Sequence, residues 1–355
     1  MKKIVLTGGG TAGHVTPNIA LLPHLKDAGF EISYIGSYDG IEKRLISDFE
    51  VPYYGISTGK LRRYFDIKNF TDPFRVLKGF AEAKSTLKKI APDVVFSKGG
   101  FVSVPVVRAA ASLGIPCIIH ESDMTPGLAN KLCIPVASKV CCNFPETFEL
   151  LPKGKAVLTG SPIREELAMG SKEAGLNMCD FHNRKPVIMV IGGSLGAASV
   201  NMCVRKALPV LLEKYQIVHI CGKEKVDNLL LNTPGYKQFE YVKEELKDLF
   251  AMADIVISRA GANAICELLA LKKPNLLIPL SAKASRGDQI LNANSFKNQG
   301  FSMILDEDDM SEDTLIKAVD ELFANRDIYR KAMEESNLAD SIAKIMDLIK
   351  EISNK

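Results

Sequence analysis

Two glycine-rich segments, about 180 residues apart, have the residue types and spacing that bind phosphate. The first is Gly8-Gly9-Gly10-Thr11-Ala12-Gly13-His14, after the apolar run Ile4–Leu6, and the second is Gly192-Gly193-Ser194-Leu195-Gly196, after Val187–Ile191. A glycine turn lets the backbone approach a phosphate, and the helix behind it directs free N–H groups and a positive dipole end at the ligand. One turn in each half predicts two phosphate-binding domains that face each other across a cleft.

The first turn matches the G-x-G-x-x-G pattern of dinucleotide-binding folds. A nicotinamide enzyme would also need an acidic residue at the end of the second strand, but Asp39 comes late and in an expected loop. The other interpretation is a tight turn that serves packing alone. His14 closes the turn, where it is either structural or a base that meets the substrate.

The second turn is the stronger pyrophosphate candidate, because the Ser194 hydroxyl and backbone N–H groups can donate to phosphate oxygens. Glu267, in the helix that follows Ser258-Arg259-Ala260-Gly261, can accept hydrogen bonds from two sugar or ribose hydroxyls. The polar run Ser285–Asn292 begins another helix and would form a second half-site for the sugar. The plainer interpretations are a simple βα turn for the second glycine turn, compensation of the helix dipole or a salt bridge for Glu267, and helix capping by Asp288 for the run Ser285–Asn292.

Three further motifs follow expected strands. Lys98-Gly99-Gly100-Phe101-Val102-Ser103 and His120-Glu121-Ser122-Asp123 would lie at the same edge as the first glycine turn, unless His120 and Glu121 are strand-end residues bound by loop backbone. Asp306-Glu307-Asp308 has the D-x-D spacing that binds divalent metal in some sugar-nucleotide enzymes. We interpret it as a solvated acidic turn, and we expect no metal site.

Short runs rich in Val and Ile alternate with helical patterns, which is typical of βαβ units in a parallel sheet. Strands are expected at 3–7, 31–36, 53–56, 93–97, 116–120, 138–142 and 156–158, and then at 187–191, 216–221, 238–241, 254–258, 275–279 and 302–305. Helices are expected in the gaps, notably at 15–28, 74–90, 197–214, 262–271, 288–299 and 311–324. The segment from Arg326 to about Ile352 is also expected to be helical.

The two halves resemble each other beyond the glycine turns. Pro92–Gly100 and Ala253–Gly261 are both apolar strands that end in Ser, a basic residue, any residue and Gly. This weak repeat predicts two similar doubly wound domains of the α/β class. Turn residues at Gly160-Ser161-Pro162 place the boundary, which gives domains 1–161 and 162–337, with a C-terminal helix of about 338–355 that packs back on the first domain.

The formal net charge of +3 conceals an asymmetry between the halves. Residues 1–161 carry 20 Lys and Arg and 14 Asp and Glu, a net +6, whereas residues 162–355 carry 25 and 28, a net −3. A basic first half predicts an anionic partner. Residues 60–80 mix basic and aromatic types, with Phe70, Phe74, Leu77 and Phe80 at helical spacing. This stripe either rests on an anionic membrane surface or faces the core, and no nucleic-acid-binding motif is present.

The eight cysteines are scattered and include no C-x-x-C pair, so we expect no disulfide framework, which fits a reducing cytosol. No apolar run approaches the roughly 20 residues that a bilayer span requires. The apolar run after Met1-Lys2-Lys3 ends at Leu6, so we expect no export signal.

These motifs resemble those of the MurG family, which transfers N-acetylglucosamine from UDP to a lipid-linked muramyl-peptide in peptidoglycan synthesis. The resemblance runs nearly end to end, and it is carried by the first glycine turn, Ser97–Phe101, His120–Asp123, Thr159–Arg164, Gly192–Ala197, Ser258–Glu267, and Asp288-Gln289 with Asn292. It departs from the family pattern at Ala12, Asp123, Leu195, Ala264 and Asp288.

The resemblance implies a GT-B fold, an inverting transfer without catalytic metal or cofactor, and peripheral attachment to the cytoplasmic face of the cell membrane. By position, UDP-N-acetylglucosamine would be held by Arg164, Ser194, Ala262, Asn263, Glu267 and Gln289. Thr11, Ala12 and Gly13 would face the donor sugar and the diphosphate of an undecaprenyl-linked muramyl-pentapeptide. His14, or a carboxylate such as Asp123, would take the proton of the attacking hydroxyl.

Four other functions remain open at this point. A UDP-N-acetylglucosamine 2-epimerase would use a related two-domain fold without a lipid acceptor, and a glycolipid synthase would use a different acceptor. A NAD-dependent oxidoreductase would bind nicotinamide. A nucleotide-sugar sensor would bind UDP without turnover.

Overall fold

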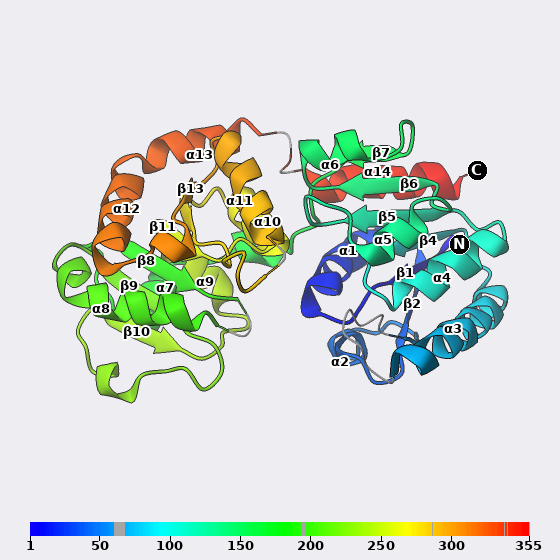
Figure 1. Ribbon diagram of the computed structural model, residues 1–355, viewed down its shortest axis with the longest axis horizontal. Coiled ribbons are helices and arrows are strands. Elements are labelled where there is room, and N and C mark those ends of the chain that lie inside the picture. The colour runs from blue at the N-terminus through cyan, green and yellow to red at the C-terminus, as the bar shows by residue number, and fades with distance from the viewer. Residues whose placement is uncertain (60–67, 194–195, 286, 337, 339, 355) are drawn as a thin grey trace. The chain divides into compact units, whose positions relative to one another are not determined.

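The computed structural model divides the chain into two compact α/β units (Figure 1). It describes all residues except 60–67, 194–195, 286, 337, 339 and 355, and the side chains of 68–73 are also left out. Unit 1 comprises Met1–Arg164 and Asp340–Lys355, and unit 2 comprises Glu165–Ala339. The chain therefore leaves unit 1 after Arg164, whereas the turn residues place the boundary after Ser161.

Unit 1 is built on a sheet of parallel strands in the order β3-β2-β1-β4-β5-β6-β7. Alternate residues of β1 enter two separate cores, Ile4 and Leu6 on one face and Val5 on the other. Burial on both faces explains why the strands are continuous apolar runs. The strands are β1 Lys3–Thr7, β2 Glu31–Ser37, β3 Tyr53–Ile56, β4 Val94–Ser97, β5 Cys117–Glu121, β6 Lys139–Cys142 and β7 Ala156–Leu158.

Helices cover both faces of this sheet. Side chains of α1, α2 and α14 share a core with Ile4, and side chains of α3 and α4 share the other core with Val5. Helix α14 also packs on α1 and β4, which brings the end of the chain back to unit 1 (Figure 1). The helical elements are η1 Ala12–His14, α1 Thr16–Asp27, α2 Ile41–Ile46, α3 Lys68–Ile90, α4 Ser103–Ser112, α5 Leu128–Cys133, α6 Pro145–Leu150 and α14 Ser341–Ser353.

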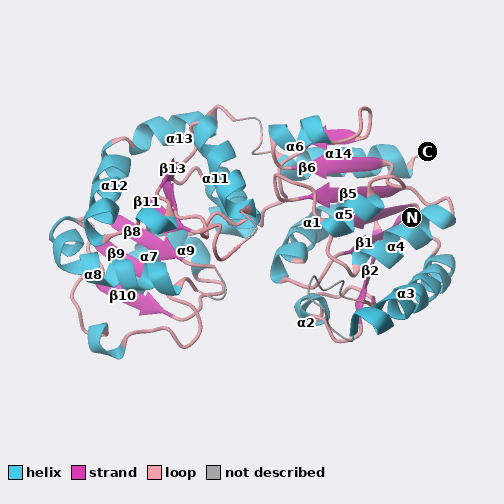
Figure 2. Cartoon of the chain, viewed as in Figure 1, coloured by secondary structure: helices cyan, strands magenta, loops and turns pink. Residues whose placement is uncertain are grey.

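Unit 2 repeats the plan with strands in the order β10-β9-β8-β11-β12-β13, all parallel (Figure 2). Helices α8 and α12 contribute to a core with β8 and β11. The strands are β8 Val187–Ile191, β9 Gln216–Ile220, β10 Tyr236–Phe239, β11 Ile255–Ser258, β12 Asn275–Leu277 and β13 Met303–Ile304. The helices are η2 Glu165–Ala168, α7 Lys172–Cys179, α8 Ala198–Lys214, η3 Asn228–Leu230, α9 Leu246–Met252, α10 Ala262–Ala270, α11 Asp288–Asn298, η4 Glu307–Asp309, α12 Glu312–Ala324 and α13 Arg326–Glu334.

The strand order reverses at the same place in both sheets, beside β1 in unit 1 and beside β8 in unit 2. Each glycine turn follows the strand at this reversal, which is where doubly wound folds bind ligands. The expected α/β class with two doubly wound Rossmann-like domains is confirmed.

Three local expectations are corrected. Strand β10 begins two residues before the predicted 238–241, and the helix expected from Arg326 to Ile352 is interrupted between α13 and α14. Phe74 and Leu77 of α3 are 75% and 66% exposed, so the core-facing interpretation of the basic aromatic stripe is wrong for these two residues. Residues 60–67 of that stripe lie outside the described residues.

All eight cysteines are described, and each is buried as a free thiol. None of the helices in the described part of the chain combines the length and apolar character that a membrane span requires.

Candidate functional site

The first glycine turn is shaped around the buried carboxylate of Glu42. Its Oε2 accepts a hydrogen bond from Gly10 N–H at 3.1 Å, and its Oε1 accepts one from Ser37 N–H at 2.9 Å. A Cβ atom on Gly9 would lie 2.5 Å from the carboxyl carbon of Glu42, so any side chain at this position would displace the carboxylate. Because Gly10 N–H already binds a carboxylate of the chain itself, this turn differs from a dinucleotide-binding turn. Sequence reasoning considered Asp39 as the acid beyond β2 and missed Glu42, three residues later.

His14 lies at the end of this turn with its imidazole oriented by Gly9. Its Nδ1 is 3.1 Å from the Gly9 carbonyl oxygen, which can only accept, so Nδ1 carries the proton and Nε2 keeps its lone pair. Burial and then the charge of Lys98 lower the pKa of His14, against the Gly9 hydrogen bond and the charges of Asp123 and Glu42. A neutral imidazole with a free Nε2 can accept a proton.

Lys98 follows β4 and is 1% exposed. Its Nζ lies 2.7 Å from His120 Nδ1, 2.7 Å from Ser122 Oγ and 3.2 Å from Ser161 Oγ. His120 Nε2 donates to the Gly160 carbonyl oxygen at 2.8 Å, so its Nδ1 is the acceptor for Lys98. Burial and the charge of Lys98 hold the pKa of His120 well below its usual value. Lys98 therefore joins the ends of β4 and β5 to the segment after β7.

Glu121 organises the loop that carries Asp123. Its carboxylate accepts hydrogen bonds from Asp123 N–H at 3.0 Å, Gly127 N–H at 2.9 Å and the Asn130 side chain at 2.9 Å. His120 and Glu121 are thus strand-end residues that hold the loops, the plainer of the two interpretations. Asp123 is half-buried, and its charge acts on the His14 imidazole.

The structure therefore brings the first-half candidates together at the carboxyl edge of one sheet. Thr11, Ala12 and Gly13 run through the turn and η1 to His14, and Thr11 Oγ1 is 3.1 Å from His14 Nδ1. The turns after β1 and β4 touch, because a Cβ on Gly100 would lie 2.3 Å from the Gly9 oxygen. Arg164 is the last residue of the first segment of unit 1, before the chain enters unit 2.

The second glycine turn lies between β8 and α8. A Cβ on Gly192 would lie 2.5 Å from Ala197 N, and a Cβ on Gly196 would lie 2.0 Å from the Cys221 oxygen. These approaches require glycine and bring the start of α8 close to β8. Ser194 and Leu195 lie outside the described residues.

The other second-half candidates follow β11 and β12 at the same sheet edge. Ala262, Asn263 and Glu267 lie in the first two turns of α10. Gln289 lies in the first turn of α11, and its Oε1 accepts a hydrogen bond from Leu280 N–H at 3.1 Å. Asn292 donates to the Ala260 carbonyl at 3.3 Å, which ties α11 to the turn before α10.

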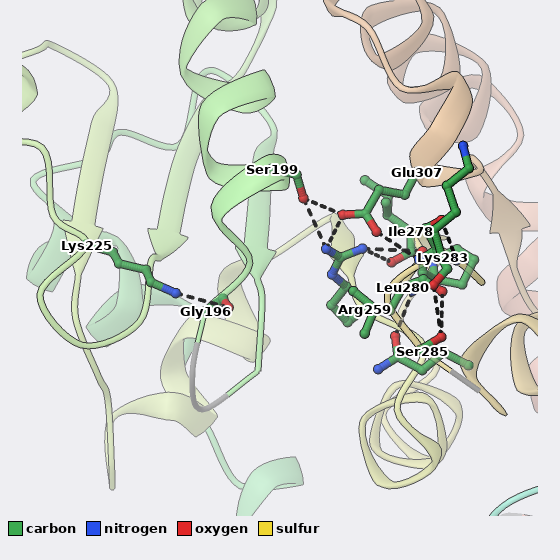
Figure 3. Close-up of polar contacts among 12 residues, drawn as sticks. Gly196, Ser199, Lys225, Arg259, Ile278, Leu280, Lys283, Ser285 and Glu307 are labelled. Carbon is green, nitrogen blue, oxygen red and sulfur yellow. Dashed lines mark hydrogen bonds and ion pairs between the residues drawn. The ribbon is translucent and has the colours of Figure 1, made fainter. Parts of the chain in front are cut away.

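The expectation that Asp306-Glu307-Asp308 is a solvated acidic turn is wrong for Glu307. It forms an ion pair with Arg259 in which both side chains are largely buried (Figure 3). Arg259 is the counterpart of Lys98 in the internal repeat. Lys98 follows β4, which pairs with β1, and Arg259 follows β11, which pairs with β8. Each basic side chain binds the end of the next strand, β5 or β12, and also more distant loops.

The chain matches two family models. Residues 4–142 match the glycosyltransferase family 28 N-terminal domain, and residues 187–351 match its C-terminal domain. A transferase of Lachnospira eligens, named UDP-N-acetylglucosamine--N-acetylmuramyl-(pentapeptide) pyrophosphoryl-undecaprenol N-acetylglucosamine transferase, is 68% identical over 99% of this chain and 100% of its own length.

Two solved structures cover almost the whole chain. The crystal structure of Acinetobacter baumannii MurG is 28% identical, with a TM-score of 0.79 over 99% of this chain and 100% of that one. A UDP-GlcNAc 2-epimerase from Neisseria meningitidis, bound to UDP-GlcNAc, has a TM-score of 0.68 over 99% of this chain and 100% of its own. At 12% identity it shares the fold alone.

Proposed function

Because this chain belongs to the MurG family within glycosyltransferase family 28, we propose that it transfers N-acetylglucosamine from UDP-N-acetylglucosamine to a lipid-linked muramyl-pentapeptide in peptidoglycan synthesis. The observation that carries this proposal is the 68% identity to a transferase of that name over the full length of both chains. The GT-B glycosyltransferase fold agrees with it.

We propose that unit 2 binds the donor. Helices α8 and α10 begin at the carboxyl edge of the sheet, where their N–H groups and dipoles attract a diphosphate. Ser194 and Arg164 would donate to the phosphates, and Glu267 would accept hydrogen bonds from two hydroxyls. Ala262, Asn263 and Gln289 would complete the site. As UDP leaves, these donors would stabilise its negative charge without a metal.

His14 is the favoured general base in this proposal. Its Nδ1–H is held by Gly9, so the Nε2 lone pair can take the proton of the acceptor hydroxyl as that oxygen attacks the anomeric carbon. The bond to UDP breaks on the opposite face, which inverts the configuration. Asp123 is the second candidate because it lies at the same edge. Thr11, Ala12 and Gly13 would face the donor sugar and the acceptor diphosphate.

We also propose peripheral attachment to the cytoplasmic face of the cell membrane. The exposed Phe74 and Leu77 lie beside the exposed Arg75 and Lys78 on α3, a combination that suits anionic lipid. A lipid-linked acceptor requires such contact, whereas an epimerase does not.

The test supplies UDP-N-acetylglucosamine with and without a lipid-linked muramyl-pentapeptide and follows UDP release and sugar products. Release of UDP only with the acceptor, together with a disaccharide lipid product, supports the proposal. Formation of the manno epimer from the donor alone would establish the epimerase instead. UDP binding without turnover would indicate a sensor, and product with diacylglycerol alone would indicate a glycolipid synthase.

A further inference from the structure

Arg259 and Glu307 lie at the centre of a polar network inside unit 2 (Figure 3). Arg259 Nη2 is 2.5 Å from Glu307 Oε1 and 3.1 Å from Ser199 Oγ, and the Ser199 hydroxyl also donates to Glu307 Oε1. The Arg259 and Glu307 side chains are only 11% and 14% exposed. A largely buried pair is screened by water and salt less than a surface pair, and its charge-assisted hydrogen bonds are stronger than neutral ones.

Both partners of this ion pair also hold the segment that follows β12. Arg259 Nη1 donates to the carbonyl oxygens of Ile278 at 3.1 Å and Pro279 at 3.3 Å. Glu307 Oε2 accepts the Ser281 N–H at 2.9 Å. Both oxygens of the Glu307 carboxylate are therefore engaged by groups of the protein itself.

The network joins the three segments on which the donor candidates lie. Ser199 is in the first turn of α8, behind the second glycine turn, and Arg259 directly precedes the turn into α10. The segment after β12 leads to α11 and is bound to Gln289 through Leu280 N–H. Figure 3 shows Arg259 between Ser199 on one side and the backbone near Ile278 on the other.

We propose that Glu307 and Arg259 are positioning residues for the UDP-sugar donor, because their ion pair sets the spacing between the starts of α8, α10 and α11. This inference rests on the proposed function. Neither residue belongs to the donor-contacting set, and their effect on binding would pass through the elements they hold.

The ion pair is present at any pH used for an activity assay. Burial would raise the pKa of Glu307, but the hydrogen bonds from Arg259, Ser199 and Ser281 outweigh burial and lower it to about 2. Effects of Glu307 substitutions near neutral pH therefore report the loss of an intact ion pair.

The experiment compares Glu307→Gln with a control that removes an exposed ion pair. That pair also joins the segment after β12 to the turn that contains Glu307. Lys283 Nζ lies 3.1 Å from Asp308, with the two side chains 82% and 53% exposed, so Asp308→Asn is the matched control. We expect Glu307→Gln to weaken UDP binding, measured by calorimetry, by roughly 10- to 100-fold, because small misplacements of binding groups have effects of that size. The KM of Glu307→Gln for the sugar donor should rise together with its UDP dissociation constant, whereas its KM for the lipid acceptor should not change. In Asp308→Asn, UDP binding and both KM values should remain those of the unsubstituted protein.

A merely structural role gives a different result. If Glu307→Gln lowers the melting temperature but binds UDP as well as Asp308→Asn does, the inference is wrong. If Glu307→Gln does not fold, Ser199→Ala decides, since it removes one hydroxyl and keeps the ion pair. A loss of UDP affinity of at least about threefold in Ser199→Ala supports the inference. A smaller loss, or an unchanged affinity, overturns it. Failure of the unsubstituted protein to bind UDP would contradict the proposed function instead.

Discussion

The ammonium group of Lys98 lies 2.7 Å from Nδ1 of His120, where it places a buried positive charge next to the turn that carries His14. A Cβ on Gly8 would lie 3.3 Å from the Lys98 Cβ and 2.6 Å from the His14 oxygen, so the two residues flank the same glycine. After burial, this charge is the main cause that lowers the pKa of His14.

Lys98→Met should raise the pKa of His14. A base is inactive when protonated, so the acid limb of the kcat/KM profile should move to higher pH. The His14 ring should show the same shift when its titration is followed by NMR. Lys131→Met, which removes an exposed lysine of unit 1, serves as the control. An unchanged His14 titration would mean that the charge of Lys98 does not reach this imidazole.

His14→Asn should lower kcat by about 10²- to 10⁴-fold, because it removes a general base. The asparagine amide can still donate to the Gly9 oxygen, so the turn should keep its shape. UDP binding, which we assign to unit 2, should not change in calorimetry.

The same measurement on Asp123→Asn separates the two base candidates. If His14→Asn keeps activity within about tenfold while Asp123→Asn loses it, the carboxylate and not the imidazole is the base. Glu121 holds this loop through the Asp123 backbone N–H, a hydrogen bond that the substitution keeps.

Gly100→Ala should destabilise unit 1 by about 1–3 kcal/mol and lower kcat, because its backbone is left-handed (φ +82°) and its new Cβ would lie 3.2 Å from His14 Nδ1 as well as against Gly9. Gly114→Ala is the control, since Gly114 also has a positive φ (+74°) but open space around it. Urea unfolding of both variants measures the difference. Equal losses of stability would show that the contact between the two turns is unimportant.

Glu307→Gln should change how unit 2 responds to acid. The pKa of Glu307 is lowered from 4.5 to about 2 by folding, so the carboxylate stabilises the folded state above pH 4.5, and this contribution is lost as the pH falls through about 2. The variant should lack this component, on the order of 2–3 kcal/mol in the unfolding free energy at pH 5. Urea unfolding at pH 5 and pH 3 tests it, and parallel losses in the unsubstituted protein and the variant would contradict it.

Much of the architecture is encoded locally. Apolar runs such as Val187–Ile191 become buried parallel strands, and the glycine turns appear where the backbone must approach another chain segment. The repeat of Ser97-Lys98 in Ser258-Arg259 also predicted two related sheets, because the same short pattern occupies the same place in each. The periodicity of apolar residues and the residue preferences of turns depend on neighbours along the chain, so both can be predicted without a tertiary structure.

The partners of the buried charges were decided only by the tertiary structure. Glu42 binds Gly10 from 32 residues away, Arg259 binds Glu307 from 48 residues away, and Lys98 reaches Ser161 from 63 residues away. No local pattern encodes such pairings, since each depends on which loops the strand order brings to one edge of the sheet. For this reason the D-x-D pattern predicts a solvated Glu307, although its carboxylate is largely buried in the network that surrounds Arg259.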